Sequence, residues 1–231
     1  MRNILITGAN GGLGIAIARA FADESKENIL WLGVRKNRER AHKSGGNLLD
    51  LDVTDPAAWR NAAKAIGRVD VLVNNAGAHD DALLAAMPAE SWERVLSTNL
   101  DAVFHGCQAV LPQMISQRAG RIINIASLSA LLAPAGQTNY AAAKAGVVAL
   151  TQSLAKEVAR LGITVNAICP GYVETDALAG LPEEQRAAAL AKIPMRRFGK
   201  PGEIAAAVRF LACPEASYIT GSVLKIDGGI L

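Results

Sequence analysis

A glycine-rich turn near the amino terminus constrains this chain more than any other feature. The turn, Thr7-Gly8-Ala9-Asn10-Gly11-Gly12-Leu13-Gly14, follows the apolar run Ile4–Ile6 and opens a helical pattern at Ile15. Glycines at a strand-to-helix turn let the backbone approach a pyrophosphate, whose charge the helix N-terminus stabilises. Glycines also simply make tight turns, but the position directly after the first strand predicts a dinucleotide site.

Short apolar runs then alternate with helical patterns along the chain. The further runs are Ile29–Leu32, Leu48–Leu51, Val69–Val73, Arg121–Ile125, Ile163–Ala167 and Val223–Ile226. Prolines that mark helix starts lie between them, at Asp55-Pro56, Met87-Pro88 and Lys200-Pro201. Right-handed crossovers place helices on both faces of a parallel sheet. The pattern predicts a Rossmann-type, doubly wound, seven-stranded parallel sheet in a three-layer α/β/α arrangement.

Composition agrees with this fold. Hydrophobic residues make up 51% of the 231 residues and aromatic residues only 4%, as expected for a parallel sheet packed with small aliphatic side chains. We find no internal repeat and no linker rich in Pro, Gly and Ser. We therefore expect one domain, residues 1–231, that binds the dinucleotide and carries the catalytic groups. The segment Tyr172–Lys200, with a helical stretch at Pro182–Lys192, is either a mobile cover for the cofactor cleft or a surface insertion.

Charge and terminal sequence favour a cytoplasmic protein. The net charge of +3 comes from 24 basic and 21 acidic residues without long runs of one sign, which indicates neither a nucleic acid nor a membrane partner. The chain reaches its first predicted strand by Ile4, so we expect no signal peptide.

The cysteines and histidines do not suggest a metal site or a disulfide framework. The three cysteines are odd in number and far apart, and none of the three histidines has metal-ligand spacing. These residues are Cys107, Cys169, Cys213, His42, His79 and His105. We expect a reducing compartment and no metal.

Two motifs together carry a family resemblance. The glycine turn reads Thr-Gly-x-x-x-Gly-x-Gly, with Gly8, Gly12 and Gly14 in place, and Asn74-Asn75-Ala76-Gly77 follows the fourth apolar run. In this order on these strands, they resemble the short-chain dehydrogenase/reductase family. The resemblance covers essentially the whole chain, and it implies a nicotinamide-dependent oxidoreductase.

The resemblance implies cofactor-binding residues in the loops after several strands. They are Gly8, Asn10, Gly11, Gly12, Leu13, Gly14, Arg35, Asp52, Val53, Asn75, Ala76, Gly77, Tyr140, Lys144, Pro170, Gly171, Val173 and Thr175. Among them, Asp52-Val53 corresponds to the adenine site, and the loop from Pro170 to Thr175 to the nicotinamide site. A Pro-Gly turn alone would account for Pro170-Gly171 but not for Thr175 at the family distance.

The second strand favours NADPH over NADH. A carboxylate at its end would hold the ribose 2′-hydroxyl of NADH, whereas a cation would hold the 2′-phosphate of NADPH. The family's acidic position falls on or near Val34, and Arg35 follows it. Arg35 is expected to bind the phosphate, with Lys36 or Arg38 in support.

A Tyr-Lys pair supplies the predicted chemistry of ketone reduction. Tyr140 and Lys144 lie at i and i+4 on one helix face, and Ser127 precedes Tyr140 by the thirteen residues of the family pattern. The resemblance makes Tyr140 the general acid, with a pKa lowered by the Lys144 cation, and Ser127 the donor to the carbonyl oxygen. Ser129 is the competing serine. Asn99 matches the family residue that positions a water for proton relay.

The closer resemblance is to 3-oxoacyl-[acyl carrier protein] reductases. It rests on Gly136–Gly146, Gly162–Asn166, Tyr172–Asp176 and Tyr218–Gly221. It implies reduction of 3-oxoacyl thioesters, bound to acyl carrier protein or CoA, to 3-hydroxyacyl thioesters. Polyketide, sugar or steroid ketoreductases of the same family, and a non-catalytic NADPH-sensing protein, are the alternatives.

Two partners follow from this resemblance. Arg118 aligns with a basic position that would meet an acidic acyl carrier protein, whereas a second such position falls on Leu161, beside Arg160. A homotetramer is expected, because the helical segments Ser91–Ile115 and Tyr140–Leu161 are apolar on more than one face. The residues concerned are Ala102, Val103, Ala109, Val110, Ala145, Val147, Val148 and Leu150. In the family such helices, and a second surface around Val223–Ile226 and the C-terminus, pair across two-fold axes.

Overall fold

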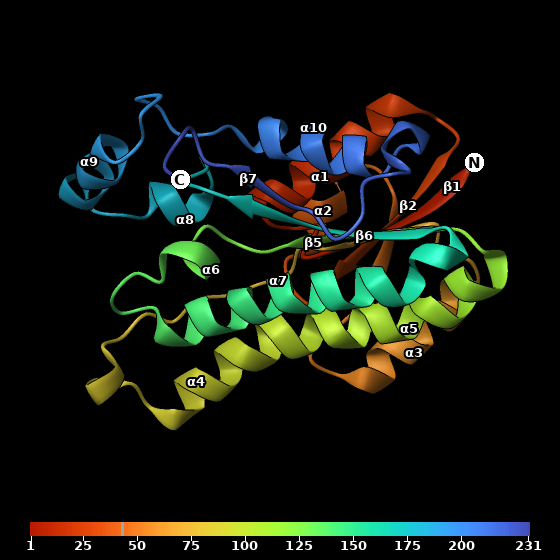
Figure 1. Cartoon of the computed structure of the whole chain (residues 1–231), viewed down its shortest axis with the longest axis horizontal. Coiled ribbons are helices and arrows are strands. Elements are labelled where there is room, and N and C mark those ends of the chain that lie inside the picture. Colours follow the sequence, from red (N-terminus) through yellow and green to blue (C-terminus); the bar gives the residue numbers. More distant parts are fainter. Residues whose placement is uncertain (43) are drawn as a thin grey trace.

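A seven-stranded sheet organises the computed structural model, which describes residues 1–42 and 44–231 (Figure 1). Its strands are β1 (Arg2–Thr7), β2 (Asn28–Val34), β3 (Asn47–Asp50), β4 (Val71–Asn74), β5 (Gly120–Ile125), β6 (Ile163–Pro170) and β7 (Val223–Ile226). They pair in parallel in the order β3-β2-β1-β4-β5-β6-β7. The predicted seven-stranded parallel sheet is confirmed. Five of the seven apolar runs lie wholly within their strands, whereas Leu51 and Val69-Asp70 fall just outside β3 and β4.

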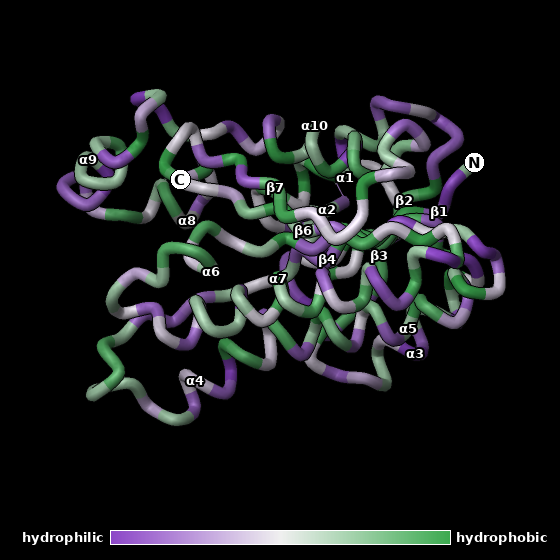
Figure 2. The backbone as a smooth tube through the Cα atoms, in the orientation of Figure 1, coloured by the Kyte–Doolittle hydropathy of each residue, from purple (hydrophilic) through white to green (hydrophobic). Residues whose placement is uncertain are grey.

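Helices cover both faces of the sheet, which confirms the predicted three layers. One face carries α1 (Gly12–Glu24), α2 (Arg38–His42) and α10 (Pro201–Leu211), and the other carries α3 (Pro56–Ile66), α5 (Ala102–Gln117) and α7 (Thr138–Val158). Two separate hydrophobic clusters, one on each face, contain for example Ile17 with Ile204, and Trp59 with Val147. Figure 2 shows hydrophobic segments gathered in the strands between the helix layers. No helix in the described part of the chain is long and apolar enough to span a membrane.

Proline marks the helix starts as the sequence indicates. Pro56 opens α3, where the Asp55 side chain accepts a hydrogen bond from the backbone of Ala57 at 2.8 Å. Pro201 opens α10. At the third site, Pro88 is the residue before α4 (Ala89–Leu96), one position earlier than a proline in the first turn.

The expected helix Ser91–Ile115 is not continuous. It consists of α4, a π-helical turn at Ser97–Asp101 and α5. The Asn99 side chain donates to the Val95 carbonyl oxygen at 2.8 Å, and so competes for an oxygen that would accept the α-helical backbone hydrogen bond. This competition explains the local widening of the helix.

The carboxyl ends of the strands carry most of the irregular structure. The helices there are α6 (Ser129–Leu132), α8 (Asp176–Ala179) and α9 (Glu183–Ala191), and a short 3-10 turn at Leu84–Ala86 follows β4. Two further 3-10 turns, Ala159–Leu161 and Pro214–Ala216, instead precede β6 and β7. Figure 1 places α8 and α9 beyond the carboxyl end of β6. Arg40 of α2 forms an ion pair with Asp176 of α8, so two segments from different ends of the chain meet there.

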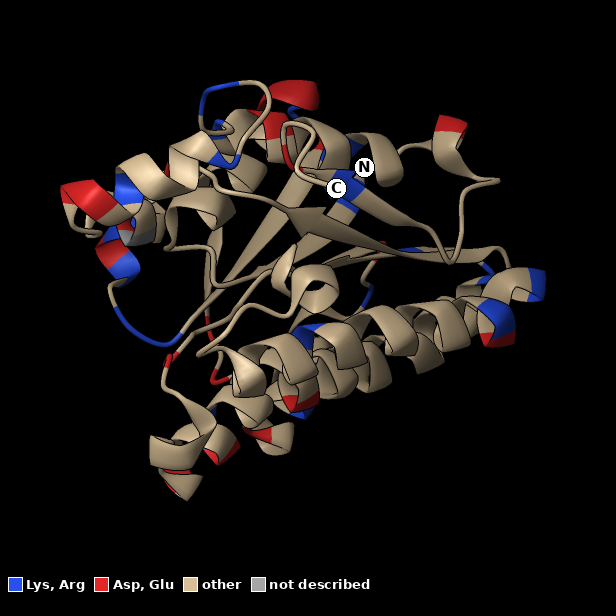
Figure 3. Cartoon of the chain, turned by 60° about the vertical axis from the view of Figure 1, so that its left-hand side comes forward, with Lys and Arg blue, Asp and Glu red and all other residues tan. Residues whose placement is uncertain are grey.

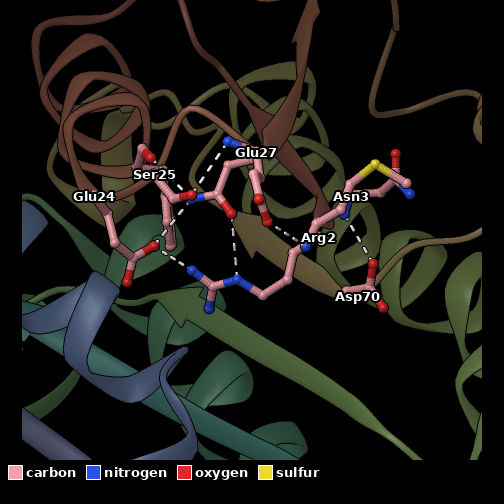
Figure 4. Close-up of polar contacts among 9 residues, drawn as sticks. Arg2, Asn3, Glu24, Ser25, Glu27 and Asp70 are labelled. Atoms are coloured by element: carbon pink, nitrogen blue, oxygen red, sulfur yellow. Dashed lines mark hydrogen bonds and ion pairs between the residues drawn. The ribbon is translucent and has the colours of Figure 1, made fainter.

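The opposite, amino-terminal edge is fastened by polar contacts (Figure 4). Arg2 pairs with Glu24 at the end of α1, and the Asn3 backbone donates to Asp70 at 2.8 Å. Because the Asp70 carboxylate takes the Asn3 N–H, regular β1–β4 pairing begins only at Ile4 and Val71.

A chain of buried polar side chains crosses the core beneath α7. Asn74 of β4 donates to Asn124 of β5 at 2.9 Å, and Asn124 donates to Thr151 of α7 at 2.9 Å. Thr151 in turn donates to the Val147 carbonyl oxygen at 2.8 Å. The chain therefore ties the two central strands to the helix that bears Tyr140 and Lys144.

Candidate functional site

A cavity of about 830 Å³ lies at the carboxyl ends of the strands, where the strand order reverses between β1 and β4. Ligands of open α/β sheets bind at this point. Every predicted cofactor residue lines the cavity, and of the predicted catalytic residues Ser127, Tyr140 and Lys144 line it. Its further lining residues include Lys36, Thr54, His79, Arg94, Ser97, Thr98 and Asp176.

Thr7 joins the two glycine-containing loops at this crevice. Its hydroxyl oxygen accepts hydrogen bonds from the backbone N–H groups of Asn75 at 3.0 Å and Ala76 at 2.9 Å. The Asn75 side-chain amide in turn donates hydrogen bonds to the carbonyl oxygens of Thr7 at 2.9 Å and Gly8 at 3.2 Å. The glycine turn and the Asn75–Gly77 loop are thus one rigid unit.

Two glycines are required by this packing. Gly8 has a φ of 61°, and a Cβ there would lie 2.9 Å from the Ala76 Cα atom. A Cβ on Gly14 would lie 2.3 Å from the Gly8 carbonyl oxygen. A Cβ on Gly12 would come no closer than 3.6 Å to Thr175, across the cavity. The turn brings the backbone and the N-terminus of α1 to the cavity wall, as a pyrophosphate requires.

The end of β2 differs in one respect from the simple expectation for a phosphate site. Arg35 lines the cavity, but its guanidinium donates to Asp52 at 3.0 Å. Asp52 also accepts from the Thr54 hydroxyl at 2.7 Å, and although burial acts to raise the pKa of Asp52, the contacts with Thr54 and Arg35 leave that pKa lowered. The side chain of Asn10, in the glycine turn, donates to the Lys36 carbonyl oxygen at 2.9 Å and so links the turn to the segment after β2. The predicted phosphate and adenine residues are therefore coupled to each other.

Tyr140, Lys144 and Ser127 meet at the other end of the cavity. Tyr140 and Lys144 occupy successive turns of α7, and the Lys144 ammonium nitrogen lies 5.7 Å from the centroid of the Tyr140 ring. Lys144 is buried and donates to the Ile125 carbonyl oxygen at 2.9 Å. Ser127, just beyond β5, is half-buried beside Tyr140.

The expected lowering of the Tyr140 pKa is wrong. Burial raises the pKa of Tyr140, and the neighbouring Ser127 hydroxyl opposes this rise only in part. Burial also lowers the pKa of Lys144 to about 8. The reason is that Lys144 directs its hydrogen bond to Ile125 rather than to the phenol, so desolvation dominates for both groups.

Ser129 turns away from this group. Its hydroxyl donates to Gln137 at 2.8 Å, while its backbone N–H donates to the Ser127 hydroxyl oxygen at 3.1 Å. Ser129 does not line the cavity, so the geometry favours Ser127, as the spacing predicts.

Asn99 lies behind the cavity wall. It is fully buried, and its side-chain amide donates to Ala78 at 2.6 Å and Val95 at 2.8 Å. Its side-chain oxygen has no partner in the structure. A Cβ on Gly77 would lie 2.7 Å from this oxygen and 3.5 Å from the Lys144 nitrogen, so the missing side chain leaves a space that both polar atoms face. A water in that space would connect them.

Sequence reasoning missed Thr7, Thr54 and His79. Thr7 opens the glycine motif, but only its contacts with the second loop reveal its role. His79 lies in the exposed loop after Gly77, and its ring centroid is 6.2 Å from that of Tyr140. Its place two residues after a family motif was a signal that could have been used. Among the described residues, no three His, Cys, Asp or Glu side chains group as metal ligands, and the three cysteines are unpaired.

Residues 8–231 match the family described as enoyl-(acyl carrier protein) reductase. The chain is 45% identical over 236 residues to 3-oxoacyl-[acyl-carrier-protein] reductase FabG of Vibrio cholerae, covering 98% of this chain and 96% of that protein. It is 44% identical over 237 residues to FabG of Thermotoga maritima, with the same coverage. Nodulation protein G of Azospirillum brasilense is 42% identical over 238 residues.

Proposed function

This chain belongs to the short-chain dehydrogenase/reductase family, and from that premise we propose that it is an NADPH-dependent reductase of 3-oxoacyl thioesters. The observation that carries the proposal is the meeting of Ser127, Tyr140 and Lys144 at one end of a cavity whose other end holds Arg35. Relatives named as 3-oxoacyl-[acyl-carrier-protein] reductases that match nearly the full chain support the substrate class.

The residues present fit a dinucleotide. The cavity runs from Arg35, at the end of β2, past the glycine turn to Tyr140. Arg35 would hold the 2′-phosphate, Gly12 and Gly14 the pyrophosphate, and Lys144 the nicotinamide ribose. Bound NADPH supplies the hydride that reduces the carbonyl carbon.

The chain's own residues manage the proton and the developing charge. Tyr140, whose pKa is raised by burial, stays protonated at neutral pH and donates its phenolic proton to the carbonyl oxygen. Ser127 donates a hydrogen bond to the same oxygen, a contact that strengthens as negative charge develops. Lys144 stabilises the phenolate that remains, and the buried oxygen of Asn99 holds a water through which that phenolate regains a proton.

An acyl carrier protein is the proposed carrier of the substrate. Arg118 and Arg160 are both exposed, and Arg118 donates to the Arg160 carbonyl oxygen at 3.2 Å. They precede β5 and β6, at the end of the sheet opposite the cavity, and the twenty residues from Tyr140 to Arg160 correspond to about 30 Å of helix. A carrier bound at this pair would therefore serve the cavity of a neighbouring subunit. Figure 3 shows basic and acidic residues interspersed on the face in view. We therefore expect an acidic carrier protein to be attracted to the immediate surroundings of Arg118 and Arg160 and not to a whole face of the molecule.

A homotetramer is the proposed assembly. Of the apolar residues that suggest it, Ala102, Val103, Val110 and Val147 are buried within the subunit. Ala145 is exposed, and Ala109, Val148 and Leu150 are half-buried. The large exposed apolar side chains on these helical segments are Trp92 of α4 and Phe104 and Ile115 of α5. Around β7, Phe210, Tyr218, Leu224 and Leu231 are exposed. Two such surfaces, each paired about a two-fold axis, generate a tetramer. Light scattering that reports a stable, active monomer would overturn this assignment.

We assign residues 1–231 to one domain, because the proposed cofactor and catalytic residues come from loops of a single sheet. The three unpaired cysteines support a reducing compartment, the cytoplasm.

Following NADPH absorbance with a panel of substrates tests the function. We expect turnover of 3-oxoacyl thioesters, on acyl carrier protein and on CoA, to exceed that of simple ketones, sugars and steroids. An enoyl thioester belongs in the panel because the matched family is described as an enoyl reductase. Preference for the enoyl substrate would replace carbonyl reduction with alkene reduction. NADPH binding without any turnover would favour a sensor.

A further inference from the structure

Asn139, the residue that precedes Tyr140 in the sequence, is fully buried but does not line the cavity. Its side-chain oxygen accepts the backbone N–H of Tyr140 at 2.7 Å, and its side-chain amide donates to the Asp80 carbonyl oxygen at 3.0 Å. We propose that Asn139 is a positioning residue that fixes Tyr140 against the loop Ala78–Ala82. This inference rests on the proposed reduction, in which Tyr140 is the acid.

The first contact satisfies a group that the helix cannot satisfy. α7 begins at Thr138, and its first backbone hydrogen bond runs from Ala141 to Gln137 at 2.7 Å. The N–H of Tyr140 therefore has no intrahelical acceptor. The Asn139 oxygen supplies one, and it does so at the residue whose side chain must be placed accurately.

The second contact fixes what surrounds the phenol. The loop Ala78–Ala82 carries His79, whose ring meets the edge of Tyr140, and Asp81, which faces the same phenol. Lys144 faces the phenol from the next turn of α7, Ser127 from the segment after β5, and Cys169 from β6. A shift of this loop relative to α7 changes both the packing and the charge around Tyr140.

Two other tethers join the same segments, but neither reaches Tyr140. Ala82 donates to the Gly136 carbonyl oxygen at 2.9 Å, and the Gln137 side chain donates to Asp81 at 2.7 Å. Gln137 lies closer to the surface, and its contact with Asp81 is exposed. Only Asn139 combines full burial, the loop contact and the Tyr140 N–H.

The chain offers a matched control in Asn166 of β6. It too is buried, its amide donates to the Ile219 carbonyl oxygen at 2.8 Å, and its oxygen accepts the Ser222 N–H at 3.1 Å. It joins a strand to the segment before β7 and takes no part in the proposed site. Asn139→Ala and Asn166→Ala thus each remove a buried side-chain amide that makes two hydrogen bonds to the backbone, one beside the proposed site and one outside it.

The test compares kinetics, stability and the titration of the phenol. We expect Asn139→Ala to lower kcat ten- to a hundredfold, because small misplacements of a catalytic group have effects of this size. The KM for NADPH should change less than about twofold, since the pyrophosphate site is formed elsewhere. Asn166→Ala should lower the melting temperature comparably and keep kcat within about twofold of wild type.

The titration does not depend on the substrate. With three tyrosines in the chain, the ultraviolet difference between each protein and its Tyr140→Phe counterpart isolates Tyr140. Asn139→Ala should move this titration toward that of an exposed tyrosine, whereas Asn166→Ala should leave it in place. If Asn139→Ala does not fold, Asn139→Ser, which keeps a hydroxyl oxygen, replaces it with the same expectations at smaller size.

Unchanged kcat together with an unchanged Tyr140 titration in the Asn139 variant would overturn the proposal. So would an equal loss of kcat in Asn166→Ala at equal stability. Failure of the proposed function looks different: the wild-type protein then reduces no thioester, and the titration alone decides the role of Asn139.

Discussion

The Lys144 ammonium nitrogen lies 5.7 Å from the centroid of the Tyr140 ring and donates to the Ile125 carbonyl oxygen rather than to the phenol. The lysine is therefore held by the backbone of β5, close to the site where a phenolate would form. Burial lowers its pKa to about 8, so at neutral pH it is mostly charged. The site thus pairs a neutral phenol with a cation, the protonation state in which the phenol can donate a proton.

Removal of the phenolic hydroxyl should abolish turnover without loss of the cofactor. In Tyr140→Phe the ring and its packing remain, and only the proton donor is lost. We expect kcat to fall well below a tenth of wild type, which corresponds to more than about 1.4 kcal/mol in the barrier. NADPH affinity, measured by fluorescence titration, should be retained. A variant that keeps more than a tenth of the wild-type kcat would assign the acid to another residue.

Lys144 should leave a signature in the pH dependence of stability. Its pKa is about 8 in the folded chain and near the ordinary lysine value of 10.5 in the unfolded chain, so between these values the unfolded chain binds more protons. The free energy of unfolding, relative to that of Lys144→Met, should rise by about 3 kcal/mol from pH 8 to 10.5. Denaturant titrations without cofactor measure this difference. A flat difference would mean that the ammonium is solvated.

Arg35 should discriminate between the two nicotinamide cofactors. Arg35→Asp places a carboxylate where a 2′-phosphate would lie, beside Asp52. We expect the KM for NADPH to rise ten- to a hundredfold, the size of a lost charge-assisted hydrogen bond. The KM for NADH, measured on the same protein, is the control and should change little. Equal effects on both cofactors would reduce Arg35 to a support for Asp52.

Two glycines should respond to alanine in opposite ways. A Cβ on Gly14 would lie 2.3 Å from the Gly8 carbonyl oxygen, so Gly14→Ala must displace the turn. We expect a loss of about 1–3 kcal/mol of stability and much weaker NADPH binding. A Cβ on Gly202 of α10 would meet no atom within 4 Å beyond the adjacent backbone of its own helix, and Gly202→Ala should stabilise the chain by up to about 1 kcal/mol. Thermal unfolding with and without NADPH compares them. A Gly14→Ala protein as stable as wild type would mean that the turn relaxes freely.

The sheet could be read from the sequence because its signals are local. Each buried strand is a short apolar run, and Pro56 and Pro201 mark helix starts without reference to the rest of the fold. The residues that line the cavity could also be predicted, because motifs at strand ends converge at one edge of a parallel sheet.

The features that escaped prediction depend on contacts between distant segments. The π-helical turn arises where the Asn99 side chain reaches back to Val95 and across to Ala78. The Arg35–Asp52 pair joins residues from the ends of two strands, and no motif encodes it. The raised pKa of Tyr140 reflects its depth in the folded protein, which residue spacing does not report.

The buried chain Asn74–Asn124–Thr151 determines where α7 can sit along the sheet. A purely aliphatic interface would tolerate a slide of one helical turn, about 5.4 Å, with little change in packing chemistry. Here such a slide would leave the Asn124 amide and the Thr151 hydroxyl buried without hydrogen-bond partners. Each unsatisfied group would cost about 1–3 kcal/mol of stability. The hydrogen bonds among these three side chains thus hold α7 in a single position along the sheet. Substitutions in this polar chain, deep in the core, would accordingly misalign the proposed catalytic groups as well as lower stability.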